Sequence, residues 1–552
     1  MRPTLKRPCS THYKRSRESP PANPMPQSIS RLLSLGGLLV STVAIAPAQQ
    51  QPFHLSEATI SGIHAAFKSG QLTCHDLVSA YLKRIEAYNK SGPSLNAMQT
   101  VNGRALQEAD RLDAAYKASG PVGPLHCIPV ALKDQVETSD MPTSYGSAVF
   151  KDFTPKQDAT IVTKLRAAGA IIIAKAAMGE FASGYLSSAA GAIRNAYDPK
   201  RHASGSSGGT GAAVTTNMAT IGIGEDTGGS IRGPAAVSSL VGLRPTVPLV
   251  SRYGMMPARP STDTLGPIAR TVEDTAKLLD VIAGYDPHDP LTAYAVGQVP
   301  PSYTAFLNQD GLKGARIGII RQPMDAETDP ASADYKKVHQ VVDRAIDDLK
   351  RLGAQVIEAD NLPDLKALSL KLYDANEFET ESATNSYLAR QGNAPVKTLR
   401  DILLTGKVVP SRTKALLNGI GKTTDDPGYL QIQLLREQMR QKFLSIMADQ
   451  KLDAFVYATF DHQPVVIPQD ALTDANANNR GTLGNNRRLS PALGFPAITV
   501  PGGLTIDGIP VGIELMARPF SEGLLFKLAY AYEQGTHNRK PPPLTPPLNN
   551  EP

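Results

Sequence analysis

The sequence predicts an α/β fold in which α-helices cover both faces of a central β-sheet. Three stretches support this prediction: residues 158–174, 338–358 and 434–458. Each joins apolar residues at helical spacing to a short apolar run of the kind found in buried strands. Helices and strands that alternate in this way are typical of a sheet with helices on both faces.

The individual elements follow from local signals. Residues 76–88 carry apolar residues at helical spacing, and so do residues 161–168. Asp158 is a candidate N-cap for the second of these helices, and Gly169 is a candidate stop. The further predicted helices are residues 338–352 and 434–448, and the predicted strands are residues 170–174, 316–320, 354–358, 454–458 and 497–500.

The net charge of +6 lies entirely in residues 1–48, which hold seven Lys or Arg and one acidic residue. The remainder of the chain is balanced in charge. A nucleic-acid-binding protein needs a basic face on its folded part. The charge distribution therefore argues against a nucleic-acid partner.

The same region predicts a secretory signal peptide over residues 1–48, with a long n-region. Residues 32–46 form an uncharged apolar run, preceded by Arg31 and followed by Ala-Pro-Ala at 46–48, a small-x-small cleavage pattern. The run is too short to cross a hydrocarbon core of roughly 30 Å comfortably. We therefore expect a secreted or periplasmic protein with no stable membrane anchor after cleavage. A short membrane anchor and a buried helix are the alternatives, and we hypothesise that translation begins at Met25.

Residues 49–540 form the predicted main domain. Within it, residues 324–450 are richer in helix signals and charge and could form a lobe over the sheet. Residues 541–552 form a Pro-rich tail that we expect to be extended.

The three cysteines show no metal-binding spacing. A chain of this size needs no disulfide scaffold. We therefore expect Cys74 and Cys127 to be buried free thiols, although an exported chain could pair them.

Residues 204–246 contain two loops rich in glycine and serine. Ser-Gly-Ser-Ser-Gly-Gly at 204–209 and Gly-Glu-Asp-Thr-Gly-Gly-Ser-Ile-Arg at 224–232 allow tight turns and close approach of a ligand. Successive free N–H groups in such a loop can bind the oxyanion of an acyl-transfer reaction. Taken singly, each loop is equally consistent with an ordinary turn.

Two other motif interpretations are weaker. The phosphate-loop patterns GxxxxGK[ST] and GxGxxG are absent. Residues 205–209 match the GxSxG nucleophile elbow with Ser207 as nucleophile, but that motif requires a preceding strand and a later Asp and His. The preceding residues 195–201 have the composition of a loop. The candidate histidines, none in a distinctive context, are His288, His339, His462 and His537.

An upstream apolar segment ends on a lysine followed by an acidic residue: Gly-Pro-Leu-His-Cys-Ile-Pro-Val-Ala-Leu-Lys-Asp at 123–134. A lysine at a strand end is usually exposed. If Lys133 is buried, desolvation lowers its pKa, and the neutral amine can accept a proton from serine without any histidine.

Together these segments resemble the amidase signature family, over roughly residues 55–538. The characteristic parts are Gly-Pro-Leu-x-x-Ile-Pro-Val-x-x-Lys-Asp at 123–134, Gly-Ser-Ser-Gly-Gly at 205–209 and Asp-Thr-Gly-Gly-Ser-Ile-Arg-x-Pro-Ala at 226–235. Matching residues continue at 242–246, 263–270, 494–501 and 508–512. The resemblance implies a central mixed, twisted β-sheet covered by helices on both faces. It also implies a Ser-Ser-Lys triad that requires no metal or organic cofactor.

The family pattern makes Lys133 the base, Ser206 the proton relay held by a cis peptide, and Ser230 the nucleophile. The backbone N–H groups expected to form the oxyanion hole are those of Thr227, Gly228, Gly229 and Ser230. The residues expected to support the loop are Ser207, Asp226 and Arg232.

Two residues depart from the family pattern. Cys127 stands where glycine is usual, and Ser204 stands where glycine is common, which leaves the local backbone geometry open. Met178 and Phe181 lie between the lysine and serine motifs. They could line an acyl pocket or form ordinary core.

The implied function is hydrolysis of a carboxamide C–N bond through an acyl-enzyme, with a peptide amide or a small-molecule amide as substrate. Within the family, the layout and the expected export are most similar to those of bacterial peptide amidases, which release ammonia from C-terminal peptide amides. The alternatives are a fatty-acid or aryl amide hydrolase, an amidotransferase A-type subunit or, outside the enzymes, an exported amidase-like binding protein. Intact Lys133, Ser206 and Ser230 argue against the last.

Overall fold

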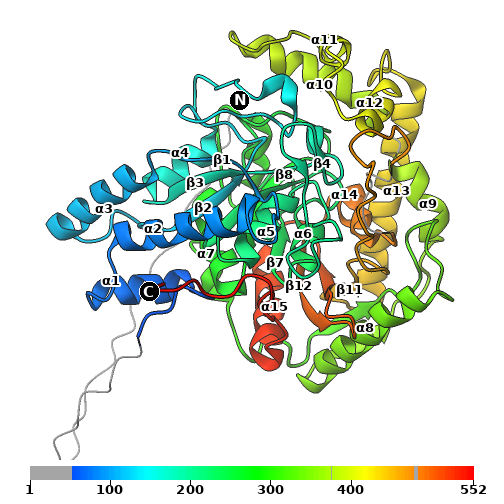
Figure 1. Cartoon of the computed structure of the whole chain (residues 1–552). Coiled ribbons are helices and arrows are strands. Elements are labelled where there is room, and N and C mark those ends of the chain that lie inside the picture. The colour runs from blue at the N-terminus through cyan, green and yellow to red at the C-terminus, as the bar shows by residue number, and fades with distance from the viewer. Residues whose placement is uncertain (1–51, 374–375, 478–482) are drawn as a thin grey trace, which may run out of the picture. The chain divides into compact units, whose positions relative to one another are not determined.

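One large mixed β-sheet organises the folded part of the chain (Figure 1). The computed structural model describes residues 52–373, 376–477 and 483–552, so the predicted signal peptide at 1–48 lies outside the described residues. The strands of the sheet are β1 (Met98–Val101), β2 (Pro129–Lys133), β3 (Ile171–Ala176), β6 (Ile221–Asp226), β7 (Val241–Arg244), β8 (Thr264–Ala269), β9 (Arg316–Ile319), β10 (Gln355–Glu358), β11 (Ala454–Ala458), β12 (Ala497–Leu504) and β13 (Pro510–Met516). A separate short hairpin joins β4 (Leu186–Ser187) to β5 (Gly191–Ala192).

Within the described residues, the eleven strands of the sheet follow the order β1-β3-β2-β6-β8-β7-β12-β13-β11-β9-β10. Parallel pairing joins β3, β2 and β6 on one side and β11, β9 and β10 on the other. Antiparallel strands lie between these two groups. The predicted α/β fold with a central mixed sheet is therefore confirmed.

Helices surround this sheet. They are α1 (Ile60–Lys68), α2 (Cys74–Ile85), α3 (Ala105–Ser119), α4 (Thr160–Ala167), α5 (Gly208–Thr215), α6 (Arg232–Ala236), α7 (Val272–Ile282), α8 (Ala333–Arg351), α9 (Leu365–Tyr373), α10 (Asn376–Arg390), α11 (Leu399–Leu404), α12 (Pro410–Leu417), α13 (Pro427–Asp449), α14 (Leu489–Leu493) and α15 (Glu522–Thr536). No helix in the described part of the chain is both long enough and apolar enough to span a membrane.

The three predicted helix–strand units are present as α4 with β3, α8 with β10 and α13 with β11. Two of the helices begin earlier than their apolar pattern suggests. Helix α8 begins after Ser332, whose side chain accepts a hydrogen bond from the Tyr335 N–H, and α13 begins with Pro427 in its first turn. Both are favourable helix starts, so capping chemistry sets the observed ends.

The predicted N-cap role of Asp158 is wrong. Helix α4 begins at Thr160 with Ala159 as its N-cap residue, and no side chain caps it. The Asp158 carboxylate instead accepts hydrogen bonds from the N–H and hydroxyl of Ser139 and pairs with Arg166 at 3.1 Å. The Asp158 carboxylate therefore binds residues distant in the chain and does not cap the helix end as the local pattern predicts.

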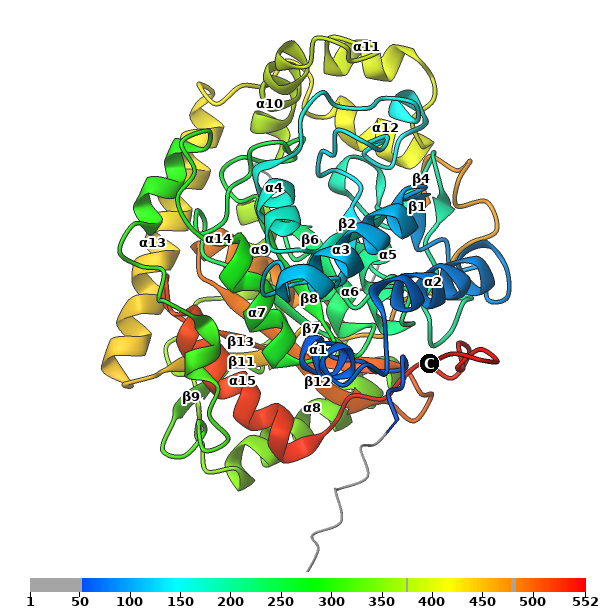
Figure 2. The same cartoon turned by 90° about the vertical axis from the view of Figure 1, so that its left-hand side faces the viewer.

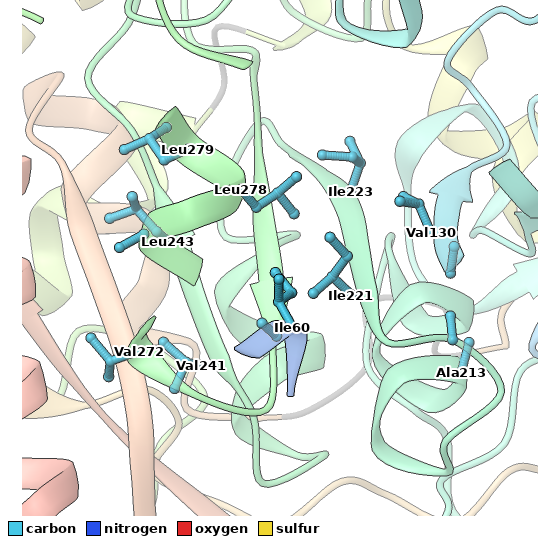
Figure 3. Close-up of a cluster of buried hydrophobic side chains, with 14 of the residues drawn as sticks. Ile60, Val130, Ala213, Ile221, Ile223, Val241, Leu243, Val272, Leu278 and Leu279 are labelled. Atoms are coloured by element: carbon cyan, nitrogen blue, oxygen red, sulfur yellow. The ribbon is translucent and has the colours of Figure 1, made fainter. Parts of the chain in front are cut away.

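Strand β6 alternates isoleucine and glycine, which gives its two faces different packing. Ile221 and Ile223 lie on the face covered by α7, near Leu278 (Figure 3). On the opposite face, a Cβ added to Gly222 would lie 2.4 Å from Thr210 Cγ2 of α5. Glycine on this face therefore lets α5 approach the sheet closely.

The two faces of the sheet carry different helix pairs. Helices α7 and α15 contact each other and cover one face (Figure 2). Helices α5 and α6 contact each other and pack on the other face. The segments that carry the predicted catalytic serines lead into α5 and α6, so both lie on this second face.

Cys74 and Cys127 form a disulfide with a Cα–Cα distance of 5.7 Å, so the expectation of free thiols is wrong. Cys74 opens α2, and Cys127 lies in the loop that leads into β2. The packing of that helix end on that loop brings the two Cα atoms into the range that a disulfide spans. The length of the chain indicates only that a disulfide is not required for folding. Whether two cysteines pair depends on their distance in the folded protein.

The region at 324–450 contains α8 to α13 and strand β10, which pairs with β9 in the main sheet. Helices α10 and α11 contribute Tyr387 and Ile402 to an apolar cluster that also contains Tyr145 and Phe181. These helices lie at the upper right in Figure 1. The boundaries of a helix-rich lobe stay a prediction.

The C-terminal tail at 541–552 packs on α2. Arg84 donates hydrogen bonds to the carbonyl oxygens of Thr545 and Pro546 and pairs with Glu551 at 2.8 Å. The tail therefore makes specific polar contacts with the folded unit.

Candidate active site

Lys133 is the last residue of β2 and is fully buried. Side chains alternate along a strand, so Lys133 shares the face of Ala131, which pairs with Gly222 of β6. This is the face on which α5 packs, and the chain enters α5 through Ser206. The two side chains therefore meet, with Lys133 Nζ 2.8 Å from Ser206 Oγ.

The surroundings of Lys133 favour the neutral amine. Its exposed fraction is 0%, and burial lowers its pKa. Nζ also lies 3.2 Å from the Glu225 carbonyl oxygen and 2.7 Å from Glu225 Oε2, whose charge raises the pKa and so opposes burial. A buried amine of lowered pKa next to a serine hydroxyl is an arrangement that can accept a proton.

Close backbone contacts hold Ser206, which is itself buried. The Gly205–Ser206 peptide bond is cis, as the family resemblance implies. The Gly179 N–H donates to the Ser206 carbonyl oxygen at 3.0 Å. A Cβ on Gly205 would lie 1.7 Å from the Gly184 carbonyl oxygen, so the segment before Ser206 requires glycine.

Ser230 lies in the turn between β6 and α6 and is half-buried. The carboxylate of Asp226, at the end of β6, accepts hydrogen bonds from the N–H groups of Gly229 at 2.6 Å and Ile231 at 3.2 Å. These bonds fix the backbone on either side of Ser230. Lys133 and Ser206 are hydrogen-bonded, whereas no hydrogen bond among the described residues joins Ser230 to Ser206.

The four backbone N–H groups predicted to bind an oxyanion divide into two sets. The Gly229 N–H already donates to Asp226, and its φ of +114° requires glycine. Within residues 52–373, 376–477 and 483–552, no protein acceptor takes the N–H groups of Thr227, Gly228 or Ser230. These three groups are the ones available to a substrate oxygen.

Two arginines brace the serine-bearing turn through Asp226. Arg232 Nε donates to its carboxylate at 3.1 Å and Arg244 Nη1 at 3.0 Å, while Arg232 also pairs with Glu514. Burial opposes ionisation of Asp226, but the two guanidinium groups outweigh it and hold the pKa of that carboxyl below its usual range. This geometry fits the predicted supporting roles of Asp226 and Arg232.

Arg487, which the sequence did not single out, joins the two serine loops. Its Nη1 donates to the carbonyl oxygens of Gly229 at 2.8 Å and Gly205 at 3.3 Å. These residues directly precede Ser230 and Ser206. One guanidinium group therefore ties the two loops together. No local sequence pattern could have revealed this contact, because Arg487 lies 258 residues after Gly229 in the chain.

Glu225 is the second residue that the sequence analysis missed. It is fully buried at the end of β6, with Oε1 accepting a hydrogen bond from Thr227 Oγ1 at 2.6 Å and Oε2 lying 2.7 Å from Lys133 Nζ. Burial raises the pKa of the Glu225 carboxyl, and the charge of the neighbouring Lys133 opposes that rise. Its only sequence signal is its position beside Asp226 in the second glycine-rich loop.

Both departures from the family pattern occur where the backbone is left-handed. Cys127 has a φ of 57° and Ser204 a φ of 60°. Glycine adopts such angles without steric cost, which explains its usual presence at these positions. Here the disulfide to Cys74 holds Cys127, and the Ser204 N–H donates to His202 Nδ1 at 2.9 Å.

Ser207 is fully buried at the start of α5 and does not follow a strand. Its hydroxyl donates to the Glu225 carbonyl oxygen at 3.2 Å. A nucleophile elbow exposes its serine at a strand-to-helix turn. The geometry therefore favours a supporting role for Ser207.

Met178 and Phe181 are buried and also line a cavity. Met178 directly precedes Gly179, whose N–H donates to Ser206, so this wall adjoins the serine loop. Further lining residues are Gln135, Tyr145, Met256, Pro257, Leu399 and Leu416. The cavity wall is largely apolar, so the core and pocket interpretations of Met178 and Phe181 are compatible.

Comparison with known proteins places this site in a family. A family model described as Amidase matches residues 76–526. The glutamyl-tRNA(Gln) amidotransferase A subunit of Exiguobacterium sp. is 35% identical over 498 residues, covering 88% of this chain and 98% of that protein. A probable amidase of Arabidopsis thaliana is 33% identical over 516 residues, covering 89% and 92%.

The fold comparison agrees. The X-ray structure of native peptide amidase from Stenotrophomonas maltophilia is similar with a TM-score of 0.79 and 34% sequence identity, covering 90% of this chain and 100% of that one. The family match spans most of the sequence and includes the segments that carry Lys133, Ser206 and Ser230. The chain therefore belongs to the amidase signature family of amide-hydrolysing enzymes.

Proposed function

We propose that this chain hydrolyses carboxamide C–N bonds through an acyl-enzyme on Ser230. The observation that carries the proposal is the contact between Lys133 and Ser206, in which a fully buried amine lies 2.8 Å from a hydroxyl. Lys133 acts as the base, Ser206 as the relay and Ser230 as the nucleophile. A lysine whose pKa is lowered by burial can serve as such a base without histidine.

The proton passes from Ser230 through Ser206 to Lys133 as the Ser230 oxygen attacks the carbonyl carbon. The carbonyl oxygen becomes an oxyanion, for which the N–H groups of Thr227, Gly228 and Ser230 are the available donors. The C–N bond then breaks, and the same relay returns the proton to the departing nitrogen. Water attacks the acyl-enzyme by the reverse path and frees Ser230. Each oxyanion donor contributes about 10²–10³ in rate in such sites.

The proposed substrates are C-terminal peptide amides with an apolar side chain, from which the enzyme releases ammonia. Two observations support this class. The residues that adjoin the serine loop on one side are largely apolar and include Met178 and Phe181. The similar solved structure from Stenotrophomonas maltophilia is a peptide amidase, and another similar structure is a peptide amidase in complex with the competitive inhibitor chymostatin.

We further propose that the protein works outside the cytoplasm. The apolar run at 32–46 and the cleavage pattern at 46–48 are typical of a signal peptide. Disulfides form and persist in oxidising compartments and are rare in the cytosol. The Cys74–Cys127 disulfide is therefore a second, independent support. N-terminal sequencing of exported protein should find Gln49 or a neighbour, and an intact Met1 on a cytosolic protein contradicts export.

Ammonia release from a matched panel tests the substrate class. The panel contains a dipeptide amide ending in phenylalanine amide, the same dipeptide ending in glycine amide, an aryl amide, a long-chain acyl amide and glutamine. We expect the phenylalanine amide to have the highest kcat/KM. Higher kcat/KM for the acyl amide, or no turnover of either peptide amide, contradicts the proposed substrate.

An amidotransferase A-type role is the second candidate, because the amidotransferase A subunit of Exiguobacterium sp. is 35% identical to this chain. It predicts turnover of glutamine and little turnover of peptide amides. The glutamine arm of the panel separates the two candidates directly.

A further inference from the structure

We infer that Glu225 is a positioning residue that orients Lys133 and stabilises its protonated form, so that the working unit is a Ser-Ser-Lys-Glu relay. The inference deepens the proposed function and rests on it. It is carried by the contact between two fully buried groups, Glu225 Oε2 and Lys133 Nζ, at 2.7 Å.

The three partners of the amine determine where its lone pair points. Lys133 Nζ lies 3.2 Å from the Glu225 carbonyl oxygen, 2.7 Å from Glu225 Oε2 and 2.8 Å from Ser206 Oγ. A neutral amine has two hydrogens and one lone pair. The carbonyl oxygen and the carboxylate only accept hydrogen bonds, so they take the two hydrogens. The lone pair is then left for the Ser206 hydroxyl, from which Lys133 must take a proton.

The same carboxylate acts again when the proton arrives. The Ser206 O–H bond breaks, a new N–H bond forms on Lys133, and Ser206 recovers a proton from Ser230. The amine becomes an ammonium ion inside a dry site, where an unpaired charge is costly. Glu225 compensates that charge, as the aspartate of a Ser-His-Asp triad does for its imidazolium. When the leaving nitrogen takes the proton back, Lys133 returns to the neutral form.

Glu225 is itself held in place. Its Oε1 accepts a hydrogen bond from Thr227 Oγ1 at 2.6 Å. The other carboxylates near the amine have partners of their own. Asp226 is paired with Arg232 and Arg244, and Asp263 accepts two backbone N–H groups in its own loop. Glu225 is therefore the carboxylate in direct contact with the amine.

The test is the pH dependence of Ser230 labelling by a fluorophosphonate probe on the full-length protein. Labelling requires a neutral Lys133, so its rate falls on the acidic side of the pKa of that amine. Glu225→Gln removes a charge that raises this pKa. We therefore expect the acidic limb of the pH–rate profile, the range in which labelling slows as the pH falls, to move to lower pH by about 1–3 units. We also expect the plateau rate to fall about 10²-fold, because the ammonium form of Lys133 loses the charge that compensates it.

A structural role alone lowers the rate without moving the limb, so an unmoved limb overturns the inference. If Glu225→Gln does not fold, as judged by thermal unfolding, Glu225→Asp decides. The shorter aspartate side chain places the carboxylate farther from Lys133, so we expect the acidic limb to move to lower pH by a smaller amount. An acidic limb that does not move again overturns the inference.

Glu533→Gln is the matched control. Glu533 is a partly buried glutamate whose pKa is also raised, to about 7, but it lies on α15 and accepts a hydrogen bond from the Val272 N–H. This variant should leave the limb in place, and a shift would show that the limb does not report on Lys133, which also overturns the inference. If wild-type Ser230 is not labelled at all, the proposed function fails. If it is labelled and Glu225→Gln leaves the limb unmoved, only the role of Glu225 fails.

Discussion

Loss of the Cys74–Cys127 disulfide should destabilise the protein and leave the catalytic groups in place. The two cysteines are 53 residues apart, and closing a loop of that length removes entropy worth about 4 kcal/mol from the unfolded chain at 25 °C. Unfolding entropy near 2.1 cal/mol/K per residue amounts to roughly 1 kcal/mol/K for a unit of this length. We therefore expect Tm to fall by about 4 °C when the bond is lost.

Calorimetry with and without a reductant measures this shift, and three variants sharpen it. Cys74→Ala/Cys127→Ala should match the reduced wild type and should not respond to reductant. Because residue 127 has a φ of 57°, Cys74→Ala/Cys127→Gly should recover about 1 kcal/mol. Cys9→Ala in the unprocessed chain, which leaves the bond intact, should behave as the unprocessed wild type. A wild-type Tm that does not respond to reductant, or free thiols at both positions in the unreduced denatured protein, would refute the reasoning.

Three further predictions concern the site and its support. Lys133→Ala should lose most of the activity and recover part of it at high pH, where hydroxide replaces the missing base. Full activity near neutral pH in a steady-state assay would contradict the role of Lys133 as the base. Asp226→Asn should lower the free energy of unfolding in urea by about 3–5 kcal/mol, because it removes the carboxylate that the buried Arg232 and Arg244 share. The pKa of Asp226 is lower in the folded protein than in the unfolded chain, where it is near 4. The contribution of Asp226 to the free energy of unfolding is therefore complete above pH 4 and is lost as the pH falls through the lower folded-state pKa. The Asn variant should lack this acid dependence of stability. Arg487→Ala removes, besides its bond to Asn485, the two charged hydrogen bonds that tie the serine loops together. Each is worth about 1.5 kcal/mol or more, so kcat/KM should fall about 10²-fold, and an unchanged kcat/KM with a lower Tm would limit Arg487 to a role in stability.

Much of the fold could be predicted because the outer units have clear local patterns. The pairs α4 with β3, α8 with β10 and α13 with β11 each combine a helical period with a buried apolar run. Strand β6 was not predicted, because it contains Gly222 and Gly224 and glycine is unfavourable in strands. Its glycines are explained by the close approach of α5, and that contact is a property of the assembled fold.

The candidate site divides in the same way. Lys133, Ser206 and Ser230 lie in motifs that are visible in the sequence, and the structure brings the first two into contact. Glu225 and Arg487 act through partners on other segments, so no local pattern reveals them. The disulfide was missed for the same reason, because its formation depends on the packing of α2 against the loop before β2.

Ser230 as the nucleophile is tested most directly by mapping the fluorophosphonate adduct on the intact protein by peptide mass spectrometry. We predict a single adduct on Ser230. It should be absent from Ser230→Ala and present in Ser207→Ala, which removes the hydroxyl of the GxSxG match. An adduct on Ser207 or Ser206 in the wild type, or undiminished labelling and turnover of Ser230→Ala, would contradict the assignment.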